Sequence, residues 1–244
     1  MAAADYTNYE EWKGWQPEYF GRFSKEDELY YSLEFGRVFA GKESLVGKRV
    51  IEIGFGGGTF VGWCALNGAD CSGVEVIDAL VQCAKQQGIE AYSTAAQSLG
   101  QIYPSSSADV IVAFDVFEHL DIANLKKTLR ECREILRPGG VLIGRVPSGD
   151  SPFSRAIQYG DITHRTILGS SAIRQLAGEV NLQINAICEP AFPVRGLGPY
   201  KGLRRSIVYA MRLIANKFLS SVMMGKPDAV LTPNIVFVLA REDI

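Results

Sequence analysis

The residues with the clearest chemical pattern lie around position 50. An apolar run, Val50–Ile53, leads into Gly54-Phe55-Gly56-Gly57-Gly58, and a helix is expected from about Thr59 to Asn67. Glycines at alternate positions allow a sharp turn that a ligand can approach without meeting a Cβ. Glu75 ends the next apolar run, at a distance where a carboxylate can accept hydrogen bonds from both hydroxyls of a ribose. The pattern therefore predicts a turn that binds a ribose-containing ligand.

Two details separate this turn from a dinucleotide-binding turn. The dinucleotide fingerprint requires a glycine at the position of Thr59. In addition, the carboxylate of Glu52 would repel a pyrophosphate, whereas a cationic or zwitterionic ligand would tolerate it. An NAD-dependent oxidoreductase is therefore a disfavoured interpretation.

Three further motifs follow along the chain. A buried strand is expected over Ala108–Asp115, a helix start at Val116–Leu120, and helical apolar spacing from Leu125 to Leu136. After a break at Arg137–Gly140, another strand is expected over Val141–Val146. The stretches E-x-G-x-G-x-G, D-V-F-E-H-L and L-R-P-G-G-V-L-I resemble, in order and spacing, the motifs of class I S-adenosylmethionine-dependent methyltransferases. The resemblance is greatest to the ubiquinone-biosynthesis type and its small-molecule relatives.

This resemblance implies a fold and a cofactor. The implied fold is α/β, with a doubly wound, seven-stranded, mostly parallel sheet of the Rossmann-like methyltransferase type. A helical N-terminal extension and a helical insertion before the last strand would complete it. The implied cofactor is S-adenosylmethionine. The residues at the family's cofactor-binding positions are Glu52, Gly54, Phe55, Gly56, Gly58, Glu75, Val76, Gln97, Asp115 and Val116.

Two of these positions have more than one interpretation. The family often places an acidic residue where it can receive the adenine amino group, but the matching stretch, Thr94–Gln97, has alanine there. The amide oxygen of Gln97 could take over this role, since it also accepts hydrogen bonds. Asp115 is expected either beside the methionine amino group or as the N-cap of the following helix, a position that aspartate favours.

The chain is expected to form one domain, residues 1–244, with an aromatic-rich N-terminal segment. Those aromatic side chains either pack the segment onto the sheet or cover the substrate site, and both interpretations can be true at once. The expected parts are a helical lid (1–47), a cofactor-binding core (48–147), a substrate-side loop, helix and strand (148–189), a basic amphipathic insertion (190–232) and a last strand (233–244).

Composition narrows the classes of function. A net charge of −2 over 244 residues gives no basic footprint for nucleic acid. The N-terminus does not resemble a secretory signal, and no continuous run of about eighteen apolar residues predicts a membrane span. The five cysteines show no metal-type spacing, and neither histidine has a cysteine nearby, so no metal site is expected. Unpatterned cysteines are typical of a reduced, cytoplasmic protein.

Both histidines are candidate bases. If the acceptor is an alcohol, a base must remove its proton during methyl transfer, and histidine titrates near neutrality. His164 lies in a D-x-T-H stretch that resembles methyltransferases encoded with bacterial surface-polysaccharide genes, where Asp161 would orient it. The family pattern places His119 nearer the cofactor. We therefore expect His164→Ala to abolish turnover while cofactor affinity is kept.

The insertion before the last strand has a separate pattern. Residues 203–224 alternate arginine and lysine with apolar side chains at helical spacing, and no acidic residue occurs from 191 to 227. Such a helix can lie on an anionic membrane, here the inner face, or bind a phosphate-bearing substrate. The alternative is packing against the sheet or at a homodimer face.

Together these features predict methyl transfer to a small-molecule acceptor, with a hydroxyl of a sugar or a polysaccharide or lipid-linked precursor as the first interpretation. A quinone or other aromatic hydroxyl is the second. A non-catalytic, S-adenosylmethionine-binding regulatory partner is the third. Fold analogy alone does not decide among acceptors.

Overall fold

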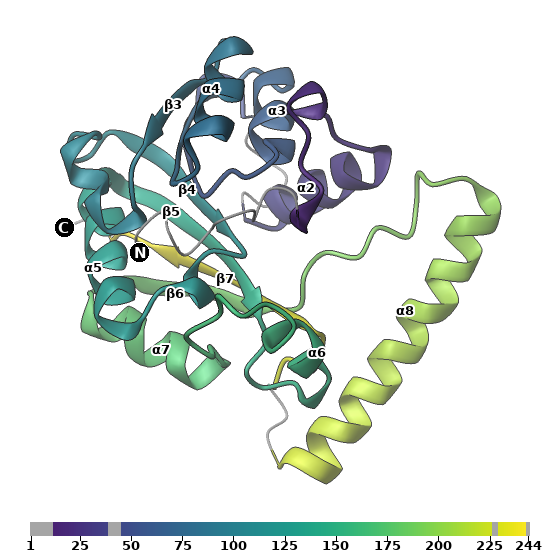
Figure 1. The fold of residues 1–244 in the computed structure, drawn as a ribbon. Helices are drawn as coiled ribbons and strands as arrows, with labels where there is room; N and C mark the ends of the chain where they lie inside the picture. The colour runs from purple at the N-terminus through teal and green to yellow at the C-terminus, as the bar shows by residue number, and fades with distance from the viewer. Residues whose placement is uncertain (1–11, 39–44, 226–228, 243–244) are drawn as a thin grey trace.

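The computed structural model describes residues 12–38, 45–225 and 229–242. In these ranges one sheet has seven strands in the order β3-β2-β1-β4-β5-β7-β6. The pairs among β1 to β5 are parallel, and β7 runs antiparallel to both β5 and β6. The predicted doubly wound, mostly parallel sheet is therefore confirmed (Figure 1).

The strands form where short apolar runs are bounded by turns. Neighbouring side chains point to opposite faces, and both faces of the central strands are buried, as is usual for a sheet covered by helices on each side. The strands are β1 Arg49–Ile53, β2 Asp70–Glu75, β3 Glu90–Ser93, β4 Ala108–Phe114, β5 Leu136–Pro147, β6 Gln183–Cys188 and β7 Asn234–Ala240.

Helices cover both faces of the sheet (Figure 1). On one face Ile51, Ile111 and Leu142 pack with the apolar sides of α5 and α7, and on the other face α2 and α3 pack over Val50, Val110 and Ile143. The helices are α2 Lys25–Val38, α3 Thr59–Leu66, α4 Asp78–Gln86, α5 Ile122–Ile135, α6 Arg155–Gln158, α7 Ser170–Glu179 and α8 Pro199–Leu219, which continues as a π-helical turn, Ser220–Met224.

Two boundaries differ from those expected. The stretch after β4 forms only a 3₁₀ turn, Phe117–His119, and the α-helix begins at Ile122 because Asp121 caps it by accepting a hydrogen bond from the Asn124 amide at 2.8 Å. The Pro-Gly-Gly stretch does not separate helix from strand, because β5 already begins at Leu136. Its pairing with β4 shifts register between Ala108 and Val110, which accommodates the turn residues.

The segment before β1 packs against the glycine turn and α3. The Gly21 amide donates to the carbonyl oxygen of Gly57 at 2.9 Å. The rings of Tyr31 and Phe35 pack on Phe60, at centroid distances of 5.2 and 5.4 Å. The aromatic residues before Trp12 lie outside the described residues, but those within them do pack this segment onto the body.

The closest approach of this segment to α3 occurs at Gly62. A Cβ there would lie 2.1 Å from the carbonyl oxygen of Gly21, so Gly62→Ala should push the segment away. We expect a loss of roughly 1–3 kcal/mol in the free energy of unfolding, because overpacking forces backbone shifts. Thermal unfolding would measure the loss.

Gly36→Ala is the matched control, because Gly36 lies in α2 and a Cβ there meets nothing within 4 Å. It should stabilise the protein by up to about 1 kcal/mol through helix propensity. Equal melting temperatures for the two variants would contradict the described docking of the segment.

Candidate active site

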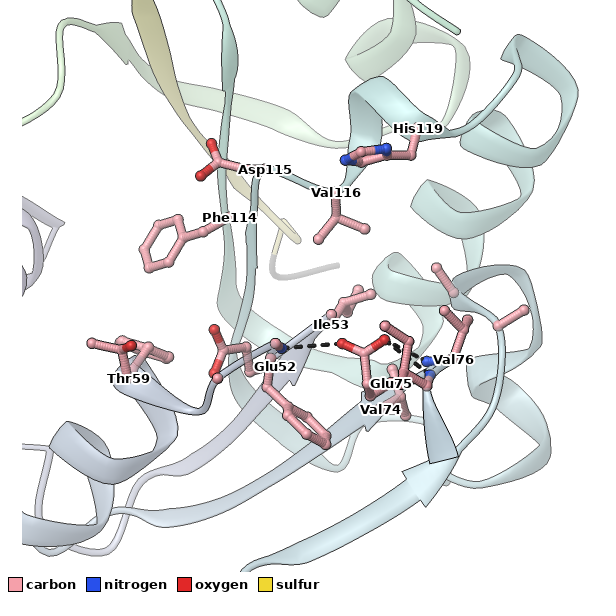
Figure 2. Close-up of a pocket in the computed structure, with 18 of the residues that line it drawn as sticks. Glu52, Ile53, Thr59, Val74, Glu75, Val76, Phe114, Asp115, Val116 and His119 are labelled. Carbon is pink, nitrogen blue, oxygen red and sulfur yellow. Dashed lines mark hydrogen bonds between the residues drawn. The ribbon is translucent and has the colours of Figure 1, made fainter. Parts of the chain in front are cut away.

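A cavity of about 240 Å³ opens at the carboxyl ends of β1, β2 and β4. This is the edge of a doubly wound sheet at which ligands bind. All ten residues predicted to bind the cofactor lie in or beside it, and only Gly58 is not part of the wall itself. Figure 2 shows Glu52 and Glu75 on one side of the cavity and Asp115, Val116 and His119 on the other.

The glycine turn has little space for side chains. Gly54, Gly56 and Gly58 adopt φ values of +68°, +50° and +75°, which favour glycine. A Cβ at Gly54 would also lie 2.6 Å from a methyl carbon of Val116, and one at Gly56 would lie 2.7 Å from the ring of Trp15. The glycines therefore allow both the turn and the close packing of its protein neighbours.

Glu75 joins the turn to the end of β2 (Figure 2). Its Oε2 accepts from the Gly56 amide at 3.1 Å, and its Oε1 accepts from the amides of Val76 and Ile77 at 2.7 and 3.2 Å. The two oxygens of a carboxylate together offer about four lone-pair sites, and these backbone amides use three of them. The contact of Glu75 with a ribose diol stays a prediction.

Two polar atoms in the cavity wall are buried without a hydrogen-bond partner, Glu52 Oε2 and Gln97 Oε1. Burial raises the pKa of Glu52 well above its usual range, and the nearby Glu75 contributes to the rise. A buried acceptor suits a cationic or amine donor, because pairing recovers the cost of desolvation. These two atoms therefore fit the ammonium group and the adenine amino group of S-adenosylmethionine.

Asp115 lines the cavity but does not act as an N-cap. Its backbone has a φ of +58°, and its carboxylate pairs with Arg145, whose Nε lies 3.0 Å from Oδ1. Burial alone would lower the pKa of Arg145, but Asp115 and then Tyr30 outweigh it and hold that pKa well above its usual value. The sequence pattern gave no sign of Arg145, which places a fixed positive charge in the wall of the cavity.

A hydrogen-bond chain reaches the cavity wall at His119. Thr163 Oγ1 lies 2.5 Å from Asp161 Oδ1 and 2.8 Å from His119 Nδ1. Thr163 has one hydroxyl proton, and the carboxylate can only accept, so this proton points to Asp161. The hydroxyl oxygen must then accept from His119, which assigns the ring proton to Nδ1 and the lone pair to Nε2.

His164 lies behind His119 and does not line the cavity. Their rings meet edge to face at 4.7 Å, and His164 Nδ1 lies 3.0 Å from the carbonyl oxygen of Gln158. Its Nε2 is 3.9 Å from Asp161 Oδ2, beyond hydrogen-bonding distance. Asp161 accepts its hydrogen bond from Thr163, so the expectation that Asp161 orients His164 stays a prediction.

The fold also gathers side chains that are distant in sequence. Glu118, His119 and His164 bring one potential ligand atom each within 4.8 Å of the others, and both carboxylate oxygens of Glu118 are buried without a hydrogen-bond partner. Burial raises the pKa of Glu118 well above its usual range, with Asp115 adding to it. The expected absence of a metal site stays a prediction, but its argument from spacing did not foresee this cluster.

The raised pKa of Glu52 leads to a test of the predicted cofactor site. Burial disfavours the charged form of Glu52 in the folded protein. The free energy of unfolding should therefore fall as the pH rises above about 4.3, the usual pKa of glutamate. Glu52→Gln should therefore raise the melting temperature at neutral pH, and this gain should vanish in acid. The variant should also bind S-adenosylmethionine roughly 10- to 100-fold more weakly, because a neutral amide oxygen replaces the carboxylate that would pair with the ammonium group.

Calorimetry and thermal unfolding across pH would measure both effects. Glu179→Gln is the control, because Glu179 is an exposed partner of Lys126 at 2.6 Å, far from the cavity. Unchanged affinity in Glu52→Gln would remove this carboxylate from cofactor binding.

Solved structures with the same fold include a SAM-dependent methyltransferase from Archaeoglobus fulgidus, with a TM-score of 0.60 and 16% identity over 89% of this chain and 94% of that one. A second, from Mesorhizobium loti, has a TM-score of 0.57 at 14% identity over 85% and 97%. The cyclase SpnF has a TM-score of 0.53 at 16% identity over 86% and 80%. At these identities the likeness shows the fold.

Sequence relatives are closer but cover less of the chain. The ubiquinone biosynthesis O-methyltransferase of Marinobacter nauticus is 29% identical over 104 residues, which are 40% of this chain and 43% of that protein. That of Roseobacter denitrificans is 32% identical over 116 residues, 45% of each. The chain thus spans less than half the length of these relatives.

The model of a family described as methyltransferase domain matches residues 27–187, more than half of the chain. This range includes the glycine turn, Glu75 and the hydrogen-bond chain that ends at His119. The buried acceptors of the cavity fit the cofactor that the motifs implied. The chain therefore belongs to the methyltransferase domain family, with S-adenosylmethionine as its cofactor.

Proposed function

We propose that this protein is an O-methyltransferase that acts on an aromatic hydroxyl of a small, apolar acceptor of the quinone-precursor class. One observation carries the proposal: the hydrogen-bond chain from Asp161 through Thr163 to His119, which ends at the cavity wall. An oxygen acceptor requires a base, and this chain supplies an oriented one.

S-adenosylmethionine supplies a methyl group that its sulfonium already makes electrophilic. The protein must therefore align the acceptor and take its proton. Alignment in a closed site is worth effective molarities on the order of 10⁵ M or more. The base then removes the proton as the acceptor oxygen attacks.

His119 is suited to be this base. Burial, and then the nearby His164, lower the pKa of His119 to about 4, so the ring is neutral at physiological pH. Asp161 acts in the opposite direction, and it would stabilise the imidazolium through Thr163 once the proton has moved. Lys13 Nζ lies 3.5 Å from Asp161 Oδ2, so these two side chains form an ion pair. Asp161 and Thr163 are thus positioning residues.

Part of the cavity wall is aromatic. Tyr31, Phe60 and Phe114 line it, and Trp15 covers the glycine turn. Such walls bind a flat, apolar ring through area burial and edge-to-face contacts. The names of the sequence relatives reported above agree with the aromatic hydroxyl, the second interpretation from the sequence.

The first test of this proposal asks which of the two histidines acts as the base. His119→Gln should lower kcat by roughly 100-fold or more, as expected for the loss of a general base. Thr163→Val should lower it by up to about tenfold, the equivalent of one hydrogen bond of about 1 kcal/mol. Affinity for S-adenosylmethionine should stay unchanged in both, and His164→Gln should cost less than His119→Gln.

The pH profile provides the readout specific to the base. Because the base works in its neutral form and has a pKa of about 4, kcat/KM should lack an acidic limb near pH 6.5. Loss of activity in His164→Gln with full activity in His119→Gln would assign the base to His164, as the sequence first indicated.

The second test concerns the acceptor class. Catechols and other hydroxylated aromatic rings should gain one methyl group by mass spectrometry, while activated sugars should gain none. Methylation of sugars alone would restore the first interpretation. Binding of S-adenosylmethionine without any turnover across both sets would favour the non-catalytic regulatory alternative.

A further inference from the structure

Helix α8 and its π-helical end stand apart from the body of the protein (Figure 1). The helix connects β6 to β7. β6 ends and β7 begins at the carboxyl edge of the parallel strands, because β7 runs antiparallel to β5 and β6. The chain therefore leaves the sheet for this insertion, and returns to it, at the edge that holds the cavity.

One side of α8 is a continuous, exposed apolar stripe. Its members follow one another at intervals of three or four residues, which places them on one face of a helix. Each is at least 54% exposed. The stripe consists of Tyr200, Leu203, Ile207, Met211, Ile214 and Phe218.

The opposite side of α8 faces the protein. Arg205 and Arg212 lie over the ring of Phe192, with guanidinium carbons 4.3 and 4.4 Å from its centroid, and Tyr209 stacks on the same ring at 6.1 Å. Arg205 also pairs with Glu26 of α2. These contacts fix which side of the helix turns outward, so the apolar stripe is a defined surface.

The charges of α8 are all positive. Lys201, Arg204 and Lys217 are exposed along the helix, and no acidic residue occurs between 190 and 227. Pairing of two copies through this stripe would bring like charges together without acidic partners on the helix. A surface that carries anionic groups above an apolar layer complements both features.

Pro199–Met224 is also long and apolar enough, by length and composition, to cross a membrane, although it contains no continuous apolar run of that length. Arg212 and Lys217 would then lie within the hydrocarbon core, which is costly for charged groups. A helix that lies in the plane of the membrane keeps them in the headgroup region and still buries the stripe.

We propose that α8 binds the surface of an anionic lipid bilayer, with the apolar stripe inserted among the acyl chains and the cations at the headgroups. A second group of exposed apolar side chains supports this orientation. It follows β5 at the same edge of the sheet and includes Phe153, Tyr159 and Ile162, which are 59%, 65% and 99% exposed. The cavity lies at this same edge of the sheet, so the apolar acceptor of the proposed function would reach it from the bilayer.

The test is flotation of the full chain with vesicles of phosphatidylglycerol and phosphatidylcholine, compared with phosphatidylcholine alone. Binding should be at least tenfold stronger to the anionic vesicles and should fall steeply at high salt, which screens the cations. Ile207→Glu with Ile214→Glu should abolish binding, and Arg204→Gln with Lys217→Gln should remove its dependence on anionic lipid.

Leu66→Glu is the matched control, because Leu66 is 75% exposed at the end of α3, at the opposite edge of the sheet. Melting temperature and turnover of a soluble acceptor should be unchanged in all variants, which separates lipid binding from the proposed chemistry. Equal flotation with both vesicle types, binding that resists high salt and alkali as a spanning helix would, or a dimer dissociated by the Ile207 and Ile214 changes would each overturn the proposal.

Discussion

The hydrogen bonds of Glu75 hold the site together, because this one carboxylate joins three backbone amides of two separate turns. They draw the glycine turn after β1 against the end of β2, and the turn in turn sets the place of Val116 and of the aromatic segment above it. A side chain at Gly56 would displace Trp15, so the ligand crevice and the covering segment depend on the same turn.

Local patterns predicted the parts of this arrangement that depend on local chemistry. The apolar run of β4 and the spacing of the glycines can each be recognised within a few residues of sequence, and both correspond to the observed structure. The link between Thr163 and His119 could not be read in this way, because they are 44 residues apart and meet only when β4 and β5 pair. The same is true of Arg145, whose significance comes from Asp115 across the strand ends.

Likeness of fold does not determine the reaction that a protein with this fold catalyses. A methyltransferase and a cyclase share the sheet of this protein at nearly equal identity, so the order of strands does not determine the reaction. In this protein the cavity wall offers an oriented imidazole, a guanidinium held by Asp115 and aromatic rings, and our proposal of an aromatic acceptor rests on these groups.

The carboxyl edge of the sheet concentrates the features that cost stability. Glu52 and Glu118 are buried carboxyls with unpartnered oxygens, Asp115 adopts a left-handed backbone, and the stripe of α8 is left in water. At the opposite edge Ser106 and Asn181 also adopt a left-handed backbone, but among the described residues no carboxylate there is buried without a partner. Parallel strands make this division natural, because their carboxyl ends converge on one edge while the connecting helices bury the rest. The stability of the sheet can then offset the unfavourable free energy of these groups at one edge. Binding of the cofactor, or of the proposed acceptor or lipid, would recover that free energy.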